Sequence, residues 1–299
     1  MLVHSLLYML HSTRHQVTAV GFNHLITFTL LLLSGERSFA CALNKPVEGS
    51  LPYELTGFSG SYADLLIIVF HQVITTGCPK LSTVYSCFTT IISNIAPYTK
   101  GLSFTSSAKL LNLIEIFGSP RFIVAAKANY VFLQHLLDAV SMMIQYEYAT
   151  NAVLIRTCIT RRSLFVNILS MEIPVSMVEE SSDRWTPSNT WLTEIKASLP
   201  IERIILRLID YLEPLLKKHV SLQKLAVDDD SVIQFLKLSS ITGVLPPPSP
   251  IIIRAYNQNK YTDLWMKTFI WSTIFINVNA NDQPLFDKSK LKLFQIGLE

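Results

Sequence analysis

The serine, histidine and acidic residues of this 299-residue chain mostly lack the spacing that catalysis requires. A hydrolase presents its nucleophile in a Gly-x-Ser-x-Gly turn between a strand and a helix. The nearest string, Gly57-Phe58-Ser59-Gly60-Ser61, has its second glycine one position too early and follows no strand pattern. A hydrolase assembled from scattered residues such as Ser59, His71 and Asp138 is therefore the enzyme hypothesis that a structure must test.

Potential metal ligands are also poorly arranged. His11 and His15 have helical spacing but no acidic residue near them in sequence, which favours a surface pair over a metal site. The aspartates 228–230 precede an apolar helical pattern, so we expect them to complement a helix dipole rather than to bind a cation. His71 and His135 lie in apolar helical segments and are expected to be hydrogen-bonded core residues.

Composition argues against several other functional classes. The chain has no phosphate loop, no Gly-x-Gly-x-x-Gly, no His-Glu-x-x-His and no EF-hand. A net charge of +3, with no basic run longer than two residues, gives no footprint for nucleic acid. We therefore predict no enzyme activity, no catalytic residue, no metal, no cofactor, no nucleic acid and no small-molecule substrate. The four cysteines are too few and too scattered for a disulfide framework and are expected to be reduced and buried: Cys41, Cys78, Cys87 and Cys158.

The elements that must carry these side chains are almost all helices. Hydrophobic residues make up 49% of the chain and recur at three- and four-residue steps, whereas strand signals are nearly absent. Ser61-x-x-Asp64 predicts a capping box at the start of a helix that ends at Gly77. Further helices are expected over 81–96, 103–117, 129–148, 201–220, 231–238 and 261–278. The fold class is therefore all-α, either an irregular armadillo- or HEAT-like solenoid or a bundle of antiparallel helices.

The apolar segment 17–33 allows three interpretations. A buried helix of a cytosolic protein fits best, because Asn23 and His24 lie at its middle and Ser34-Gly35 can end it. A membrane span and a secretory signal cut before Cys41 are the alternatives. The inward face expected for a buried helix consists of Val17, Val20, Gly21, His24, Phe28 and Leu31.

The helical pattern divides the chain into three parts. Residues 1–170 read as a helical-repeat region, 171–188 as a linker or surface loop, and 189–299 as a C-terminal helical region continuous with the first. Within the last part, the prolines at 246–248 and 250 predict an extended segment, which we expect to be a buried connector. Trp265 and Trp271 are expected in a core, with an aromatic ligand slot as the alternative.

Several strings together resemble the C-terminal portion of the high-temperature-induced dauer formation protein family, which is itself distantly similar to dymeclin. The similarity runs from about Leu6 to Glu299, in the family's order, and its strings are "LLLLSGERSFACALNKP", "SYADLLIIVFHQVITTG", "SNIAPYTKGLS", "SAKLLNLIEIF", "NAVLIRTCITRRSLF" and "GVLPPPSPIIIRAYNQN". Family members are longer and begin with a myristoylatable Met-Gly, whereas this chain begins Met1-Leu2. We therefore expect a fragment, a truncated gene model or a short isoform.

The resemblance implies a non-enzymatic helical scaffold that is cytoplasmic and peripheral on Golgi and trans-Golgi membranes. It would work with protein partners of the Golgi trafficking machinery and support the sorting of cargo into dense-core secretory vesicles. The alternative function, which follows from the apolar segment, is a small integral membrane protein anchored by residues 17–33.

Overall fold

The computed structural model describes residues 2–49, 51–52, 55, 57–173, 185–223, 229–256 and 260–280. Contacts divide the chain into one unit over Met1–Arg254 and another over Ala255–Glu299. The described residues form no β-strand; they contain an isolated antiparallel bridge between Pro46 and Ser61. The prediction of an all-α fold is confirmed.

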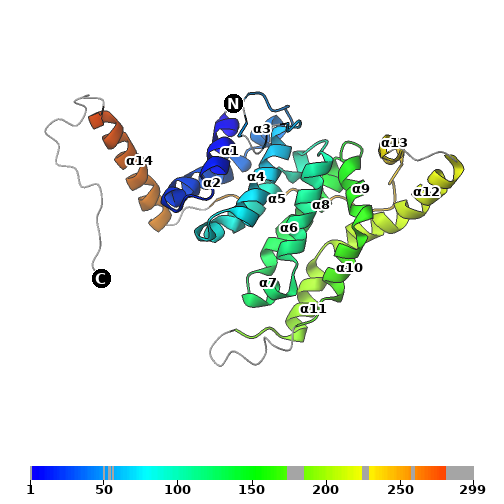
Figure 1. The fold of residues 1–299 in the computed structure, drawn as a ribbon. Coiled ribbons are helices and arrows are strands. Elements are labelled where there is room, and N and C mark those ends of the chain that lie inside the picture. The colour runs from blue at the N-terminus through cyan, green and yellow to red at the C-terminus, as the bar shows by residue number, and fades with distance from the viewer. Residues whose placement is uncertain are drawn as a thin grey trace. The chain divides into compact units, whose positions relative to one another are not determined.

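The helices of the first unit form two neighbouring rows (Figure 1). In the first row each helix packs on the next: α1 (Leu2–Thr13), α4 (Tyr62–Thr76), α6 (Phe104–Phe117), α9 (Ala152–Thr160) and α13 (Asp229–Leu238). The second row contains α2 (Val20–Ser34), α5 (Tyr85–Ile95), α8 (Tyr130–Tyr146) and the π-helix η6 (Ile201–Leu206). The rows contact each other in pairs, α1 with α2, α4 with α5 and α6 with α8. Helical hairpins stacked in this way are the arrangement of a helical-repeat protein.

Shorter or connecting elements complete this unit. They are η1 (Val17–Ala19), α3 (Arg37–Ala42), η3 (Pro79–Val84), η4 (Ala96–Tyr98), α7 (Pro120–Ala125), α10 (Arg162–Ser170), α11 (Asn189–Ser198) and α12 (Arg207–Gln223). The expected helix 81–96 thus begins as the 3-10 turn η3, with Pro79 near its start, and becomes α-helical only at Tyr85. One apolar face of η6 and α12 is buried, with Leu215 36% exposed beside it; its buried residues are Ile201, Ile204, Ile205, Leu208, Ile209, Leu212 and Leu216.

Helix α4 shows how local sequence fixes an element of the core. Ser61 is its N-cap: the Ser61 hydroxyl accepts the Asp64 N–H, and the Asp64 carboxylate accepts the Ser61 N–H at 2.9 Å. The predicted capping box is therefore confirmed. Almost every residue from Tyr62 to Val73 is buried, because α4 lies between α1 and α6 in its row and also contacts α5.

Helix α2 buries a different face from the expected one. Its buried residues are Asn23, Ile26, Thr27, Leu30, Leu31 and Ser34, so Leu31 alone of the expected inward face is buried. Polar contacts of Asn23 explain which face of α2 is buried. Asn23 accepts a hydrogen bond from the Thr13 hydroxyl at 2.6 Å and donates one to the Thr13 carbonyl at 3.3 Å. This contact joins the end of α1 to α2 and turns Asn23 toward the protein interior.

Residues Val17–Ser34 are long and apolar enough to cross a membrane, and 33% of them are buried within the protein. Core helices of soluble proteins and N-terminal signals meet the same criteria. In the structure α2 contacts α1, α3, α5 and η3. Leu32, on its outer side, is 49% exposed.

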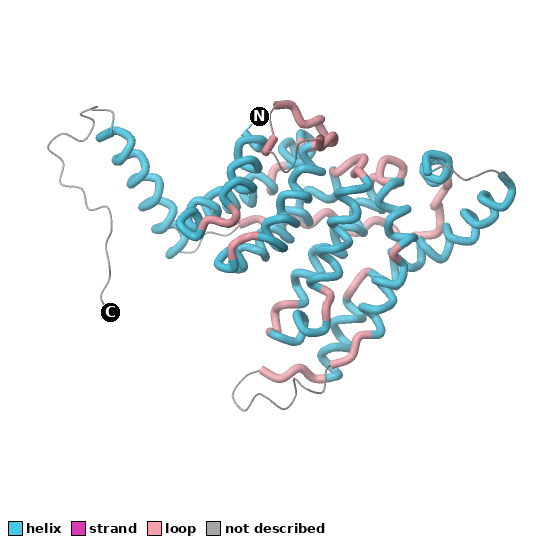
Figure 2. Tube along the Cα trace, viewed as in Figure 1, coloured by secondary structure: helices cyan, strands magenta, loops and turns pink. Residues whose placement is uncertain are grey.

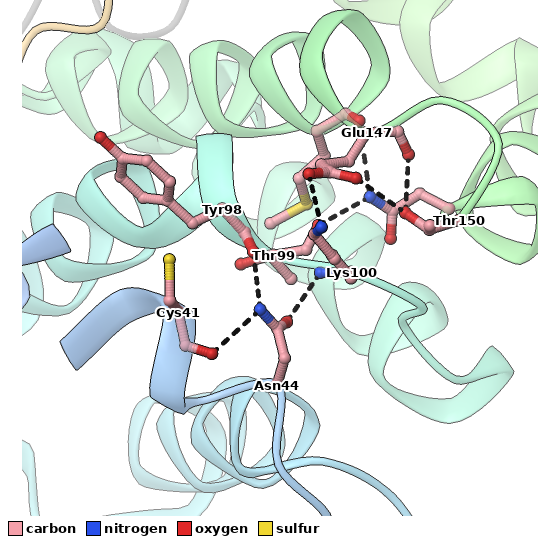
Figure 3. A network of polar contacts seen from close by, with 9 residues as sticks. Cys41, Asn44, Tyr98, Thr99, Lys100, Glu147 and Thr150 are labelled. Atoms are coloured by element: carbon pink, nitrogen blue, oxygen red, sulfur yellow. Dashed lines mark hydrogen bonds and ion pairs between the residues drawn. The ribbon is translucent and has the colours of Figure 1, made fainter. Parts of the chain in front are cut away.

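Two asparagines tie three loops together at one end of the stacked hairpins. Asn44 donates to the Cys41 and Tyr98 carbonyls at 3.3 and 2.8 Å and accepts the Lys100 N–H at 2.8 Å (Figure 3). Asn151 makes the same kind of three-bond contact deeper in the protein and is fully buried. The loop that follows η4 is thereby fixed to the end of α3 and to the start of α9.

The second unit contains the helix α14 (Lys260–Ala280), as predicted for 261–278. Trp265 stacks on Phe269 with ring centroids 5.6 Å apart. Trp271 is 59% exposed, so the prediction of a core position is wrong for this residue.

Two sequence predictions fall on residues that the structure describes only in part. Of the predicted linker 171–188, residues 174–184 lie outside the described residues. Among the three aspartates, Asp228 also lies outside them, while Asp229 begins α13.

Candidate functional site

An extended segment over residues 246–254, which we call the strap, lies against the second row of helices (Figure 2). The prolines at 246–248 and 250 prevent helix formation and favour the extended backbone. The prediction that this connector is buried is wrong, because most of its residues are exposed and Ile252 is 66% exposed. The strap lies on the surface, where hydrogen bonds rather than an apolar core hold it.

Side chains of α5 and α8 bind the strap through its backbone. Gln145 donates from Nε2 to the Pro246 carbonyl at 3.3 Å, and the Tyr146 hydroxyl donates to the Ser249 carbonyl at 2.6 Å. Asn94 accepts the Arg254 N–H at 2.9 Å and donates to the Arg254 carbonyl at 3.2 Å. A single carboxamide thus satisfies both backbone groups of one strap residue.

The Arg254 side chain reaches between α5 and α8. Its guanidinium donates to the Ser93 hydroxyl at 2.7 Å and to Asp138 Oδ2 at 2.9 Å. The ion pair is partly buried, since the Arg254 and Asp138 side chains are 31% and 26% exposed. Burial raises the pKa of Asp138, and the positive charge of Arg254 acts in the opposite direction.

A cavity of about 140 Å³ remains beneath the strap. Asp138, Ser141 and Gln145 line it from one face of α8, and Pro250 and Ile252 line it from the strap. Ser141 is 3% exposed, and its Oγ has no hydrogen-bond partner among the described residues; the same holds for the buried Oε1 of Gln145. This cavity, the Arg254–Asp138 pair and the strap form the candidate functional site, which we call the strap groove.

The residues of the hydrolase hypothesis are not brought together. Ser59 precedes α4 and lines a separate cavity with Gln72 and Lys109. His71 bonds through Nε2 to Asn112 at 2.7 Å, whereas Asp138 pairs with Arg254. Ser59, His71 and Asp138 therefore do not form a catalytic triad.

The predictions for the other possible metal ligands and nucleophiles are confirmed only in part. His15 is exposed as expected, but the prediction of a surface pair is wrong for His11, which is 1% exposed. The described residues contain no group of three or more side chains arranged to hold a metal ion. All four cysteines are free; Cys78 and Cys158 are buried as expected, whereas Cys41 is exposed. Burial raises the pKa of Cys158 to about 12, which keeps that thiol protonated at neutral pH.

His135 lies one turn before Asp138 and faces α5. Its Nδ1 lies 3.4 Å from the hydroxyls of Thr89 and Thr90. Burial, together with the positive charge of Arg254, lowers the pKa of His135 to about 4. The prediction of a hydrogen-bonded core histidine is confirmed for His71, which is buried; His135 is hydrogen-bonded but only partly buried.

The lowered pKa of His135 predicts a pH dependence of stability. Below about pH 6.5 the unfolded chain binds a proton at this residue and the folded chain does not, so stability falls as the pH falls toward 4. Allowing for partial exposure, we expect the free energy of unfolding to drop by about 2 kcal/mol across this window relative to His135→Gln. Urea unfolding at a series of pH values measures the difference. If the stability of the wild type and of His135→Gln changed with pH in the same way, the assignment of this effect to His135 would be contradicted. The same would follow if His15→Gln altered the pH dependence as much as His135→Gln does.

Sequence reasoning missed the residues that form the strap groove. Asn94 and Arg254 are 160 positions apart, and no local pattern connects them. One signal was present: Asn94 interrupts the otherwise apolar end of α5 ahead of Pro97, and buried polar residues in such helices have a bonding partner.

Comparison with known proteins agrees with this architecture. The family model described as "Dymeclin: Dyggve-Melchior-Clausen syndrome protein" matches residues 1–273. Protein HID1 of Mus musculus is 28% identical over 389 aligned residues, which cover 97% of this chain and 49% of that protein. Protein HID1 of Dictyostelium discoideum is 24% identical, over 95% of this chain and 44% of that protein. The Ubp5-interacting protein ftp105 of Schizosaccharomyces pombe is 32% identical over 38% of this chain and 12% of its own length.

The chain spans about half the length of the curated HID1 relatives it matches. The alignment with the mouse protein is longer than the chain itself, so that relative has residues inside the matched region that this chain lacks. No solved structure matches the chain. Because the family model covers all but the last 26 residues and the HID1 proteins align along nearly the whole chain, the protein belongs to the HID1/dymeclin family.

Proposed function

We propose that this protein is a non-enzymatic scaffold in membrane trafficking at the Golgi and trans-Golgi network, supporting the sorting of cargo into dense-core secretory vesicles. The observation that supports the proposal most directly is family membership over most of the chain, together with the two-row array of stacked helices. Such arrays present long faces to partners, whereas the strap groove holds a segment of the chain itself.

Proximity labelling tests the proposed location at the Golgi and trans-Golgi network. A biotin ligase fused to this chain, expressed in secretory cells, should label cytoplasmic proteins of the trans-Golgi network and of immature secretory granules more strongly than the ligase alone does. Equal labelling by the fused ligase and the free ligase would contradict the proposal. Protein partners of the trafficking machinery are the expected neighbours, and peripheral attachment through such partners is the expected form of membrane association.

The rival function is an integral membrane protein anchored by 17–33, and extraction of membranes with carbonate separates the two functions. A scaffold should tolerate Leu32→Arg, because this side chain is 49% exposed on α2 and its replacement meets water. In a spanning helix an arginine at the membrane centre costs about 3 kcal/mol of insertion free energy, but Leu32 would lie at the end of the anchor, where an arginine reaches the interface at a much smaller cost. Leu32→Arg therefore tests the exposed face of α2, and carbonate extraction of the wild-type chain tests the span.

Carbonate extraction of membranes gives the readout. We expect wild type and Leu32→Arg to be released alike, with unchanged circular dichroism for the purified variant. Retention of the wild-type chain in the carbonate pellet would instead support the anchor.

A further inference from the structure

The strap groove binds its present occupant almost entirely through backbone groups. Asn94, Gln145 and Tyr146 contact the carbonyl or N–H groups of Arg254, Pro246 and Ser249. Any extended chain offers the same groups at the same spacing, so these contacts do not depend on the strap's own sequence. The side chain of Arg254 is the exception, because Ser93 and Asp138 accept hydrogen bonds from its guanidinium.

The strap leaves part of the groove unsatisfied. Gln145 donates Nε2 to the Pro246 carbonyl, which orients its Oε1 as an acceptor without a donor. Ser141 Oγ is also buried and without a partner among the described residues, and both side chains line the 140 Å³ cavity. Of the strap residues at this cavity, Pro250 and Ile252 have side chains that cannot donate a hydrogen bond, and Arg254 donates to Ser93 and Asp138. Ser249 and Arg203 also line the cavity, but no hydrogen bond joins either of them to the two unpaired oxygens. Buried oxygens in a polar cavity of this size accept hydrogen bonds from water or from a ligand that supplies N–H donors.

Position 252 is where such a donor would enter. In an extended chain residues two apart point to the same side, so residue 252 shares the side of Arg254, which faces the groove. Ile252 lines the cavity while remaining 66% exposed at its mouth. A carboxamide side chain at this position has two N–H donors for Ser141 and Gln145 and one carbonyl acceptor.

We propose that the strap groove is a binding site for an extended segment of a partner protein that carries an arginine at the position of Arg254 and a glutamine or asparagine two residues before it. The strap occupies the same groove in cis as a less complementary ligand and must leave when the partner binds. Asp138 and Ser93 recognise the arginine, and Ser141 and Gln145 recognise the carboxamide. This inference gives the proposed scaffold one of its partner sites and rests on that function only for its cellular setting.

Peptide binding to the full chain tests the proposal. The host is Arg254→Ala, in which the strap loses its guanidinium contacts to Ser93 and Asp138 and keeps the backbone bonds that any extended chain can replace. The probe is a fluorescein-labelled peptide with the sequence of residues 246–256 and the change Ile252→Gln. Fluorescence anisotropy should show binding to this host and at least tenfold weaker binding to the wild-type chain. A second peptide that also carries Arg254→Ala should bind the host at least tenfold more weakly. Absence of binding to a helical host, or equal affinity for the two peptides, would overturn the proposal.

A pair of variants in cis keeps the proposal testable if Arg254→Ala fails to fold. Ile252→Gln and Ile252→Met have similar size, but only the first has N–H donors. We expect Ile252→Gln to melt several degrees higher than Ile252→Met, because it satisfies Ser141 and Gln145. Equal melting temperatures would overturn the carboxamide assignment. These experiments contain no membrane, so their failure leaves the trafficking proposal intact, and a negative labelling experiment leaves the groove intact.

Discussion

Replacing Asp64 by alanine is expected to lower the free energy of unfolding by about 4 kcal/mol. Asp64 is 1% exposed, and its carboxylate accepts the N–H and hydroxyl of Ser61 at 2.9 and 2.8 Å, the N–H of Ser103 at 2.8 Å and the hydroxyl of Ser106. One side chain therefore closes the N-termini of both α4 and α6, where the helix dipoles favour a negative charge. Alanine would leave two backbone N–H groups and two hydroxyls without this acceptor in the protein interior.

Urea denaturation followed by circular dichroism measures this effect, and two variants act as controls. Asp64→Asn keeps the size but presents one NH₂ group to donors, so we expect about half the loss. Asp210→Ala removes an exposed carboxylate that pairs with Arg162, and its effect should stay within about 1 kcal/mol. Similar losses for Asp64→Ala and Asp210→Ala would show that the shared cap does not stabilise the fold as described.

The same carboxylate marks the limit of what sequence reasoning can predict. The capping box was predictable because Ser61 and Asp64 are three residues apart, and local chemistry decides their contact. The bonds from Asp64 to Ser103 and Ser106 were not, because those residues lie 39 and 42 positions further along the chain. Helix type and capping follow from neighbours in sequence, whereas the joining of helices follows from packing.

The face that α2 buries illustrates a second kind of failure. An apolar helix with hydrophobic residues on every side gives little periodicity from which to choose an inward face. The choice depends on Asn23, whose contacts to Thr13 require the preceding helix to be in place. A buried polar residue that looked like an interruption of the apolar pattern therefore determines which side faces the core.

The candidate site follows the same logic at longer range. The prolines of the strap predicted its extended backbone correctly, but its surface position depends on Asn94, Gln145 and Tyr146 in two other helices. A row of stacked helices presents side chains at regular intervals, and an extended chain crossing the row can meet one from each helix. Repetition of the helical hairpin thus creates a binding groove that no local sequence motif predicts.

Replacing Asn151 by leucine is expected to lower the free energy of unfolding by about 3 kcal/mol. Asn151 is fully buried; it donates to the Thr99 carbonyl at 2.9 Å and to the Met143 carbonyl at 3.4 Å, and accepts the Leu102 N–H at 3.2 Å. Leucine has the same branched side-chain skeleton but is larger and bonds to none of these groups, and water cannot reach them. Thermal and urea unfolding of the purified variant measure the loss.

Asn44 supplies a matched control, because it makes the same three-bond contact at the other side of the loop, with the Cys41 and Tyr98 carbonyls and the Lys100 N–H (Figure 3). Asn44 is only partly buried, so in Asn44→Leu water can replace the lost bonds, and the expected loss is about 1 kcal/mol. The two substitutions remove equal numbers of hydrogen bonds and differ in burial. Equal losses would mean that bond number, rather than the exclusion of water from unpaired backbone groups, decides how strongly these loops hold the helical repeats together.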